Sequence, residues 1–164
     1  MRLDRVKLEN FRNYAAQEVF FDPVCSVICG ENAQGKTNLL EAMVCLSTGK
    51  SHRTRADREL IRFEQQSFRL EGTIRARDRD FVSRIDAGAG KKKRITINDV
   101  PVRAASDLSG VLNTIFFCPE DLQLIKEGAA ARRRFIDTSL CQLRPRYSTA
   151  LSEYQRLHEH KTRI

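Results

Sequence analysis

Residues 30–37 read Gly30-Glu31-Asn32-Ala33-Gln34-Gly35-Lys36-Thr37, and this stretch decides the fold. It has the P-loop pattern Gly-x-x-x-x-Gly-Lys-Thr, in which each fixed residue has a physical task. Gly30 and Gly35 allow backbone conformations closed to other residues, so that N–H groups can turn inward around a phosphate. Lys36 supplies positive charge to the β- and γ-phosphates, and the Thr37 hydroxyl is a ligand for magnesium. The stretch therefore predicts binding of a nucleoside triphosphate with Mg²⁺.

The flanks of this loop support the prediction. The run Val24-Cys25-Ser26-Val27-Ile28-Cys29 precedes it and is almost wholly apolar, which is typical of a strand buried on both faces. Residues 38–46 favour a helix that ends before Gly49 and directs its positive N-terminal end at the phosphates. The alternative, a chance glycine-rich turn, does not explain why the motif follows a buried strand and opens a helix.

The remaining elements predict an α/β fold. Residues 3–9 and 18–21 have strand character, and 67–76, 80–86 and 94–98 alternate like an antiparallel meander. Residues 112–117 predict a second buried strand. The pattern is helical from residue 129, and Pro145 divides that region into two helices. We expect a P-loop lobe over residues 1–128, with a mixed sheet plus the meander, and the start of a helical domain over residues 129–164.

The composition narrows the classes of function. The chain has 29 Lys and Arg against 21 Asp and Glu, a net charge of +8, which favours a polyanionic partner such as nucleic acid or an acidic membrane. The alternative is a basic surface without such a partner. Five cysteines without a Cys-x-x-Cys pair predict neither a disulfide framework nor a zinc site, and reduced thiols indicate the cytoplasm. No apolar run approaches the length of a membrane span and no signal peptide is evident, so no membrane association is expected.

Further stretches resemble the RecF family of ABC-type ATPase heads, which is related to the SMC and Rad50 type. These stretches are Asn10-Phe11-Arg12-Asn13-Tyr14, the P-loop with Asn38-Leu39-Leu40-Glu41-Ala42, Gly49-Lys50-Ser51-His52-Arg53, Phe117-Cys118-Pro119-Glu120-Asp121-Leu122 and Arg132-Arg133-Arg134-Phe135-Ile136-Asp137. The resemblance covers essentially the whole chain. It implies ATP held between two protomers of an ATP-dependent homodimer. It also implies binding to gapped DNA with RecO and RecR to load recombinase in recombinational repair, replication-fork maintenance and the SOS response.

The chain also departs from the family pattern. The nearest candidate for a Walker B strand is Ile115-Phe116-Phe117-Cys118-Pro119-Glu120-Asp121, where the proline and the displaced acidic pair fit poorly. We find no signature motif, and the chain stops at Ile164 where the family continues, so we expect an N-terminal portion with an incomplete head. The full-length family implies a weak ATPase. Without these groups the chain is expected to bind ATP but hardly to hydrolyse it, since phosphoryl transfer depends on positioning them.

Several residues are candidates for the nucleotide site. By resemblance Arg12 and Asn13 lie near the nucleotide, although a solvated turn is the alternative. Glu120 and Asp121 are candidates for a metal-binding or Q-loop-like pair, or are acids at a helix N-terminus. The candidates for ATP binding are Arg12, Asn13, Gly30, Glu31, Asn32, Ala33, Gln34, Gly35, Lys36, Thr37 and Asn38, with Thr37 also the Mg²⁺ ligand.

Two basic clusters are candidates for DNA contact, with a solvated surface as the alternative for both. The first is Lys50, Arg53 and Arg55, and the second is Lys91, Lys92, Lys93 and Arg94 beside a turn that predicts a hairpin tip. Arg75, Arg77, Arg79 and Arg84 add to the charge of the meander. Because no aromatic residues are interleaved, DNA binding would be electrostatic with little sequence preference. The other classes kept open are a head of another SMC/Rad50-type ATPase, a small P-loop kinase, whose catalytic acids we do not find, and a pure nucleic-acid-binding module.

Overall fold

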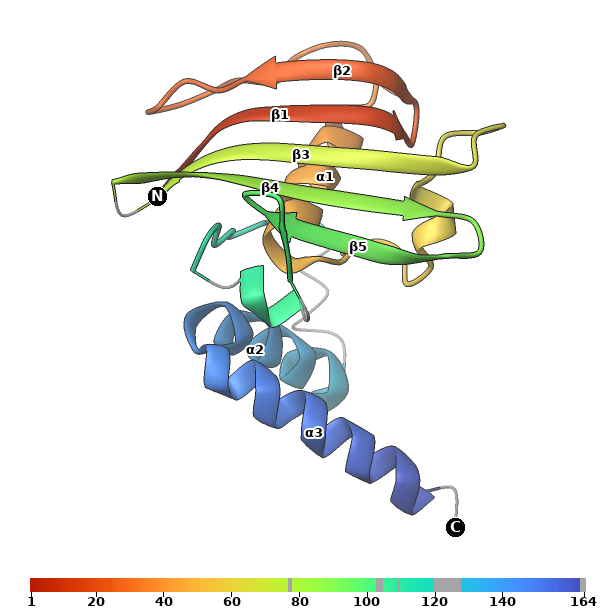
Figure 1. Cartoon of the computed structure of the whole chain (residues 1–164), viewed down its shortest axis with the longest axis vertical. Coiled ribbons are helices and arrows are strands. Elements are labelled where there is room, and N and C mark those ends of the chain that lie inside the picture. The colour runs from red at the N-terminus through yellow and green to blue at the C-terminus, as the bar shows by residue number, and fades with distance from the viewer. Residues whose placement is uncertain (77, 103–104, 109, 120–127, 163–164) are drawn as a thin grey trace. The chain divides into compact units, whose positions relative to one another are not determined.

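The computed structural model of the chain describes residues 1–76, 78–102, 105–108, 110–119 and 128–162. By their internal contacts they form two compact units, Met1–Thr114 and Ile115–Ile164. Figure 1 shows the elements of each unit. The candidate nucleotide-site residues within the described ranges all belong to the first unit, while Glu120 and Asp121 lie outside the described residues.

The first unit is built on a six-stranded sheet in the order β2-β1-β3-β4-β5-β6, and every neighbouring pair is antiparallel. Its strands are β1 (Arg2–Phe11), β2 (Tyr14–Phe20), β3 (Ser67–Ala76), β4 (Arg79–Gly88), β5 (Lys91–Ile97) and β6 (Val100–Pro101). The long helix α1 (Lys36–Thr48) lies against one face of the sheet, and the short 3₁₀ helices η1 (Asp57–Leu60) and η2 (Ala105–Leu108) complete the unit (Figure 1). The α/β class and the antiparallel meander are confirmed.

Alternation of side chains explains how the sheet and α1 enclose one core. In β3, the residues at every second position are buried and those between them are not, as expected of a strand with one solvated face. The buried side chains of the strands pack with those of α1, including Leu39, Ala42 and Leu46. A Cβ atom on Gly72 of β3 would lie 2.9 Å from a methyl group of Leu46, so the missing side chain lets the helix approach the sheet.

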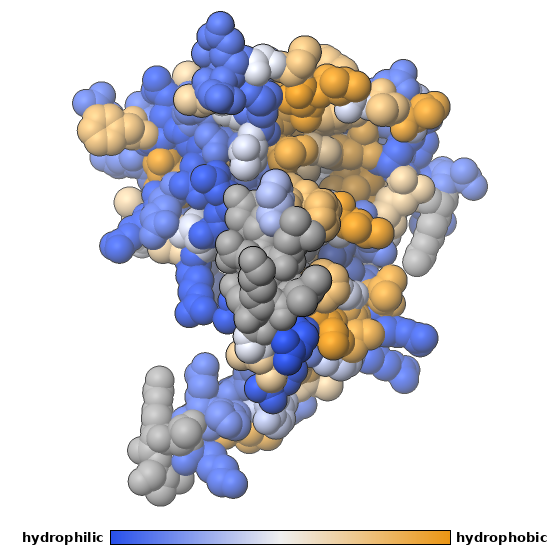
Figure 2. Space-filling view, turned by 180° about the vertical axis from the view of Figure 1, so that it is seen from behind, coloured by the Kyte–Doolittle hydropathy of each residue, from blue (hydrophilic) through white to orange (hydrophobic). Residues whose placement is uncertain are grey.

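The two predicted buried strands were wrong in this structure. Residues 24–29 and 112–117 form no strand, and the exposed fractions of Val24 and Ile115 are 94% and 102%. A buried strand needs neighbours that accept and donate its backbone hydrogen bonds, and no other strand pairs with either run in the described ranges. The sheet that forms is antiparallel, and these apolar runs are largely exposed apart from Leu112, which is buried in the core, and Ile28, which packs against it. Figure 2 shows exposed apolar side chains among hydrophilic ones, seen from behind the view of Figure 1.

The second unit contains two helices, α2 (Ala129–Leu143) and α3 (Pro145–Thr162), which pack against each other. The predicted break at Pro145 is confirmed, because α2 ends two residues earlier and Pro145 opens α3, a position where a missing N–H has no cost. The Tyr147 hydroxyl donates to Asp137 Oδ1 at 2.5 Å and ties the two helices together. No helix in the described part of the chain is long and apolar enough to cross a bilayer.

Candidate nucleotide-binding site

The P-loop connects residue 29 to α1 through three residues with positive φ. Gly30, Ala33 and Gly35 have φ values of 145°, 66° and 103°, and Gly35 is the N-cap of α1. Ala33 carries a Cβ in the left-handed region, a conformation that costs energy and is concentrated at binding sites. The P-loop pattern allows any residue at this position, so the sequence does not indicate its left-handed conformation. The loop is therefore held in a conformation that chain propensity alone does not favour.

The amine of Lys36 is folded back onto this loop. Its Nζ donates to the backbone oxygen of Gly30 at 2.7 Å and to that of Glu31 at 2.6 Å. Thr37 is exposed in the first turn of α1. A Cβ atom on Gly35 would lie within 2.7 Å of the Asn13 side chain, so the loop is close-packed on that side. These features fit a triphosphate, with Lys36 and the helix N-terminus as the positive groups.

The turn between β1 and β2 supports the P-loop from the side. Asn13 Nδ2 donates to the backbone oxygen of Gln34 at 3.1 Å, and its Oδ1 accepts from Asn38 Nδ2 at 2.8 Å. The Tyr14 hydroxyl donates to the backbone oxygen of Gly35 at 3.2 Å, and burial raises the pKa of this phenol. The structure thus brings Asn13 and Asn38 together with the P-loop, and it adds Tyr14, which the sequence did not identify as a site residue.

Glu41 of α1 is the centre of a buried polar cluster beneath this turn. Its side chain is fully buried and accepts from Arg12 Nε at 2.9 Å and from the second Arg12 guanidinium nitrogen at 2.7 Å. It also accepts from the Ser51 hydroxyl at 2.6 Å. Burial alone would raise the pKa of Glu41, but the hydrogen bonds from Arg12 and Ser51 and the charges of the two arginines outweigh it and lower the pKa. The carboxylate therefore stays ionised, and the same pairing raises the pKa of Arg12.

Arg53 joins this cluster from the segment after α1. One of its nitrogens donates to Asn38 Oδ1 at 2.9 Å and lies 3.3 Å from Glu41 Oε2. Arg12 in turn donates to the backbone oxygen of Glu59 in η1 at 2.8 Å. Arg53 was grouped with Lys50 and Arg55 as a candidate for DNA contact, but the structure places it beside the P-loop helix. Lys50 and Arg55 are exposed.

An open cavity of about 610 Å³ lies beside the P-loop. Arg12, Asn13, Asn38 and Arg53 line one part of it, and Glu59 of η1 together with residues 61–64, which include Phe63, lines the rest. The exposed fraction of Phe63 is 85%, so its ring is available to a ligand. The second candidate cluster, Lys91, Lys92, Lys93 and Arg94, belongs to β5 and does not line this cavity.

Sequence reasoning missed Glu41 and Ser51 as parts of the site. The available signal was the position of Glu41, an acid between Leu40 and Ala42 in a helix whose other buried residues are apolar except for Ser47. A buried acid requires a cationic or hydrogen-bonding partner, so its presence predicts a nearby arginine. The pattern does not indicate which arginine, because Arg12 lies 29 residues earlier in the chain.

Comparison with known proteins gives consistent results. A family model described as an AAA domain matches residues 5–162. The DNA replication and repair protein RecF of Agathobacter rectalis is 42% identical over 100% of this chain and 45% of its own length. A solved structure of the recombination mediator protein RecF with ATP, from the RecFOR pathway, superposes with a TM-score of 0.89 at 32% identity, covering 94% of this chain and 42% of that one.

A more distant structural neighbour is an SMC ATPase, with a TM-score of 0.66 at 20% identity over 83% of this chain and 98% of that one. At this identity the likeness shows a shared fold. The chain spans less than half the length of the curated relative that it matches.

Proposed function

This chain belongs to the AAA domain family, and the whole of the chain is similar to part of RecF. On that premise we propose that it binds ATP through its P-loop. The family context is DNA replication and repair. The observation that carries the proposal is the support of the P-loop by Asn13, Asn38 and Tyr14, which holds the loop in shape. Because the loop is held in shape before phosphate binds, no binding free energy is used to order it.

The phosphates would lie against the backbone N–H groups of residues 31–36 and the N-terminus of α1. On their arrival, the Lys36 amine would exchange the backbone oxygens of Gly30 and Glu31 for phosphate oxygens. Mg²⁺ would supply further positive charge, with Thr37 as its protein ligand. The nucleoside would extend into the cavity, where Arg12 carries positive charge and Phe63 offers an apolar face.

We further propose that the chain binds ATP and hardly hydrolyses it. Positioning groups supply most of the acceleration in phosphoryl transfer. In the described ranges the cavity contains two carboxylates, Glu59 and Glu64, and Glu59 already accepts from the Thr54 hydroxyl at 2.5 Å. Neither is part of a Walker B pattern. By resemblance, the whole protein would form an ATP-dependent dimer in the cytoplasm and would act with RecO and RecR at gapped DNA.

A Gly35→Ala substitution is expected to weaken ATP binding at least about tenfold. The added Cβ would meet Asn13 Nδ2 at 2.6 Å and Oδ1 at 2.7 Å, and the φ of 103° is unfavourable for alanine. Asn13 would have to leave its contacts with Gln34 and Asn38, and an interaction worth about 1.4 kcal/mol corresponds to that tenfold change. Titration of a fluorescent ATP analogue in Mg²⁺ buffer measures the effect.

Gly90→Ala provides the matched control for backbone strain. Gly90 also has a positive φ, 70°, but it lies in the β4–β5 hairpin and its added Cβ would meet nothing within 4 Å. This variant should bind the analogue as the wild-type chain does. Equal affinities of Gly35→Ala and the wild-type chain would contradict the proposed cradle.

A further inference from the structure

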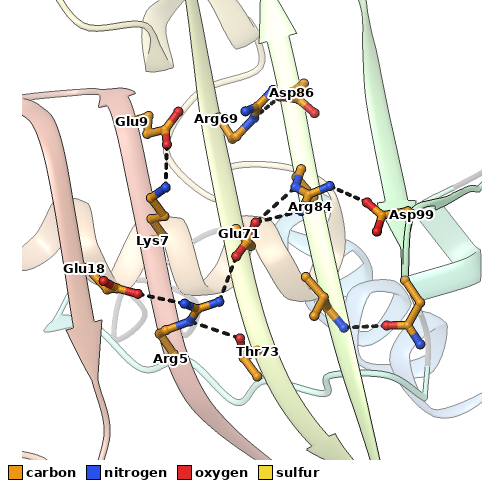
Figure 3. Close-up of polar contacts among 12 residues, drawn as sticks. Arg5, Lys7, Glu9, Glu18, Arg69, Glu71, Thr73, Arg84, Asp86 and Asp99 are labelled. Carbon is orange, nitrogen blue, oxygen red and sulfur yellow. Dashed lines mark hydrogen bonds and ion pairs between the residues drawn. The ribbon is translucent and has the colours of Figure 1, made fainter.

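The solvated face of the sheet carries many charges, but they compensate one another. Figure 3 shows Arg5 between Glu18 and Glu71, and Arg84 between Glu71 and Asp99. On the same face Lys7 pairs with Glu9 and Arg69 pairs with Asp86. Each cation in this network therefore has a carboxylate within an ion-pair distance, so the face offers a polyanion little unbalanced charge.

Two arginines of the meander that were candidates for following a DNA backbone are part of this compensation. Arg84 contacts two carboxylates, and Arg75 pairs with Asp80 at 2.9 Å. A phosphate that approached either of them would have to displace a carboxylate already in place. Arg77 lies outside the described residues.

Unbalanced positive charge is concentrated instead at the β4–β5 hairpin end of the sheet, whereas at the opposite end Arg79 is the single exposed strand cation without an ion-pair partner among the described residues. Lys91, Lys92 and Arg94 are exposed at the start of β5, and within the described ranges none of them has an ion-pair partner. Although Arg94 lies opposite Asp86 in the strand register, that carboxylate is bound by Arg69. Side chains alternate along a strand, so Lys92 and Arg94 project from one face of this edge and Lys91 from the face of Lys93 and η1. Along the strand the three span about 10 Å, which is comparable with about three phosphates at 3.4 Å per strand along a duplex.

A second set of cations adjoins the first because β5 is attached to η1. Lys93 Nζ lies 2.8 Å from Asp57 Oδ1, and this contact holds η1 beside the hairpin end of β4 and β5 (Figure 1). Arg55 and Arg58 lie within two residues of Asp57 in the chain and are exposed without an ion-pair partner in the described part of the molecule. Both acids of η1 already have partners. Asp57 binds Lys93, and Glu59 accepts a hydrogen bond from the Thr54 hydroxyl.

We propose that Arg55, Arg58, Lys91, Lys92 and Arg94, the hairpin edge, form the surface of this chain that binds the phosphate backbone of DNA. This inference rests on the proposed function, because it takes the partner from the DNA repair context. The arginines and lysines of the sheet face that are already paired with carboxylates do not take part. Contacts to phosphates alone carry no sequence information, so binding at the hairpin edge is independent of DNA sequence and weakens steeply with salt.

The test compares two triple variants of the 164-residue chain with equal loss of charge. Lys91→Gln, Lys92→Gln and Arg94→Gln together remove three cations from the hairpin edge. Arg133→Gln, Arg134→Gln and Lys161→Gln remove three exposed cations from α2 and α3. A third variant, Arg69→Gln with Arg75→Gln, tests the sheet face. Fluorescence anisotropy with a labelled duplex is measured at several salt concentrations, after circular dichroism has verified folding.

The hairpin triple variant is expected to lose at least about tenfold in DNA affinity at low salt and to reduce the salt slope by about two to three. The other two variants should remain within about twofold of the wild-type chain. Equal losses in both triple variants would overturn the assignment in favour of general charge attraction. If the wild-type chain binds DNA and the hairpin variant binds it equally well, the assignment fails while DNA binding stands. If the wild-type chain does not bind DNA, the proposed DNA-binding role itself fails, whereas ATP binding is tested separately.

Discussion

Replacing Lys36 with alanine is expected to abolish the rise in melting temperature that Mg-ATP gives the wild-type chain. A ligand at about 100 times its Kd stabilises the folded state by about 2.7 kcal/mol. In a domain of this size that corresponds to roughly 5–10 °C, because each kcal/mol shifts the midpoint by about 2–4 °C. The variant loses the ammonium group that would bind the β- and γ-phosphates. Its core should be unchanged because Lys36 is not a member of the core and its amine bonds the loop oxygens of Gly30 and Glu31.

Differential scanning fluorimetry over a range of Mg-ATP concentrations measures this shift. Lys50→Ala is the matched control, since Lys50 is an exposed lysine just after α1 and does not line the cavity. The control should keep the full ATP-dependent rise. A rise of equal size in Lys36→Ala would sink the proposal that the P-loop binds the nucleotide.

Glu41→Ala is expected to have the largest effect on stability, a loss of about 3 kcal/mol in the free energy of unfolding. Removing one partner of a buried ion pair typically costs about 3–5 kcal/mol. The lower end applies because Arg12 and Arg53 are 21% and 45% exposed and can recover some hydration. Arg12 would lose both bonds to the carboxylate, and the Ser51 hydroxyl would lose its acceptor.

Urea denaturation at neutral pH measures the change for Glu41→Ala. Glu153→Ala, which removes an exposed acid from α3, is the control for the loss of one negative charge and should change the midpoint little. A loss below about 1 kcal/mol in Glu41→Ala would show that the cluster is not a stabilising centre.

The pH dependence of stability should identify Glu41 through its charge. The folded state lowers the pKa of this group, so its contribution is present above the ordinary glutamate pKa of about 4.3 and is lost as the pH falls through the lower folded value. Glu41→Gln cannot titrate, so the stability difference between it and the wild-type chain should shrink as the solution is acidified below about pH 4. Urea midpoints from pH 3 to pH 7 would show this, and a constant difference across that range would contradict it.

The local sequence pattern is sufficient to predict some structural features of this molecule but not others. The P-loop and its helix follow from residue types at fixed spacing, and the meander follows from the two-residue alternation of β3 and β4. Whether the runs 24–29 and 112–117 are buried could not be predicted in the same way. An apolar run indicates that a strand is suited to burial, but the partners that bury it lie elsewhere in the chain.

Long-range pairing also decides which charges are free. Arg84 and Lys91 are both cations in basic stretches of the sequence. Glu71 and Asp99 pair with Arg84, whereas no carboxylate in the described residues pairs with Lys91. Arg53 belongs to a basic run with Lys50 and Arg55, and its charge makes it a candidate for DNA contact. Its position beside Glu41 depends on how the segment after α1 folds back, which no local pattern specifies.

The resting position of Lys36 affects the entropy of nucleotide binding. A lysine that is fixed in one conformation loses roughly 1.5–2 kcal/mol of rotamer freedom at room temperature. In this structure the amine is already held by the backbone oxygens of Gly30 and Glu31, so most of that loss occurs when the chain folds. Nucleotide binding then exchanges one set of acceptors for another, and the free lysine does not have to be immobilised at that moment.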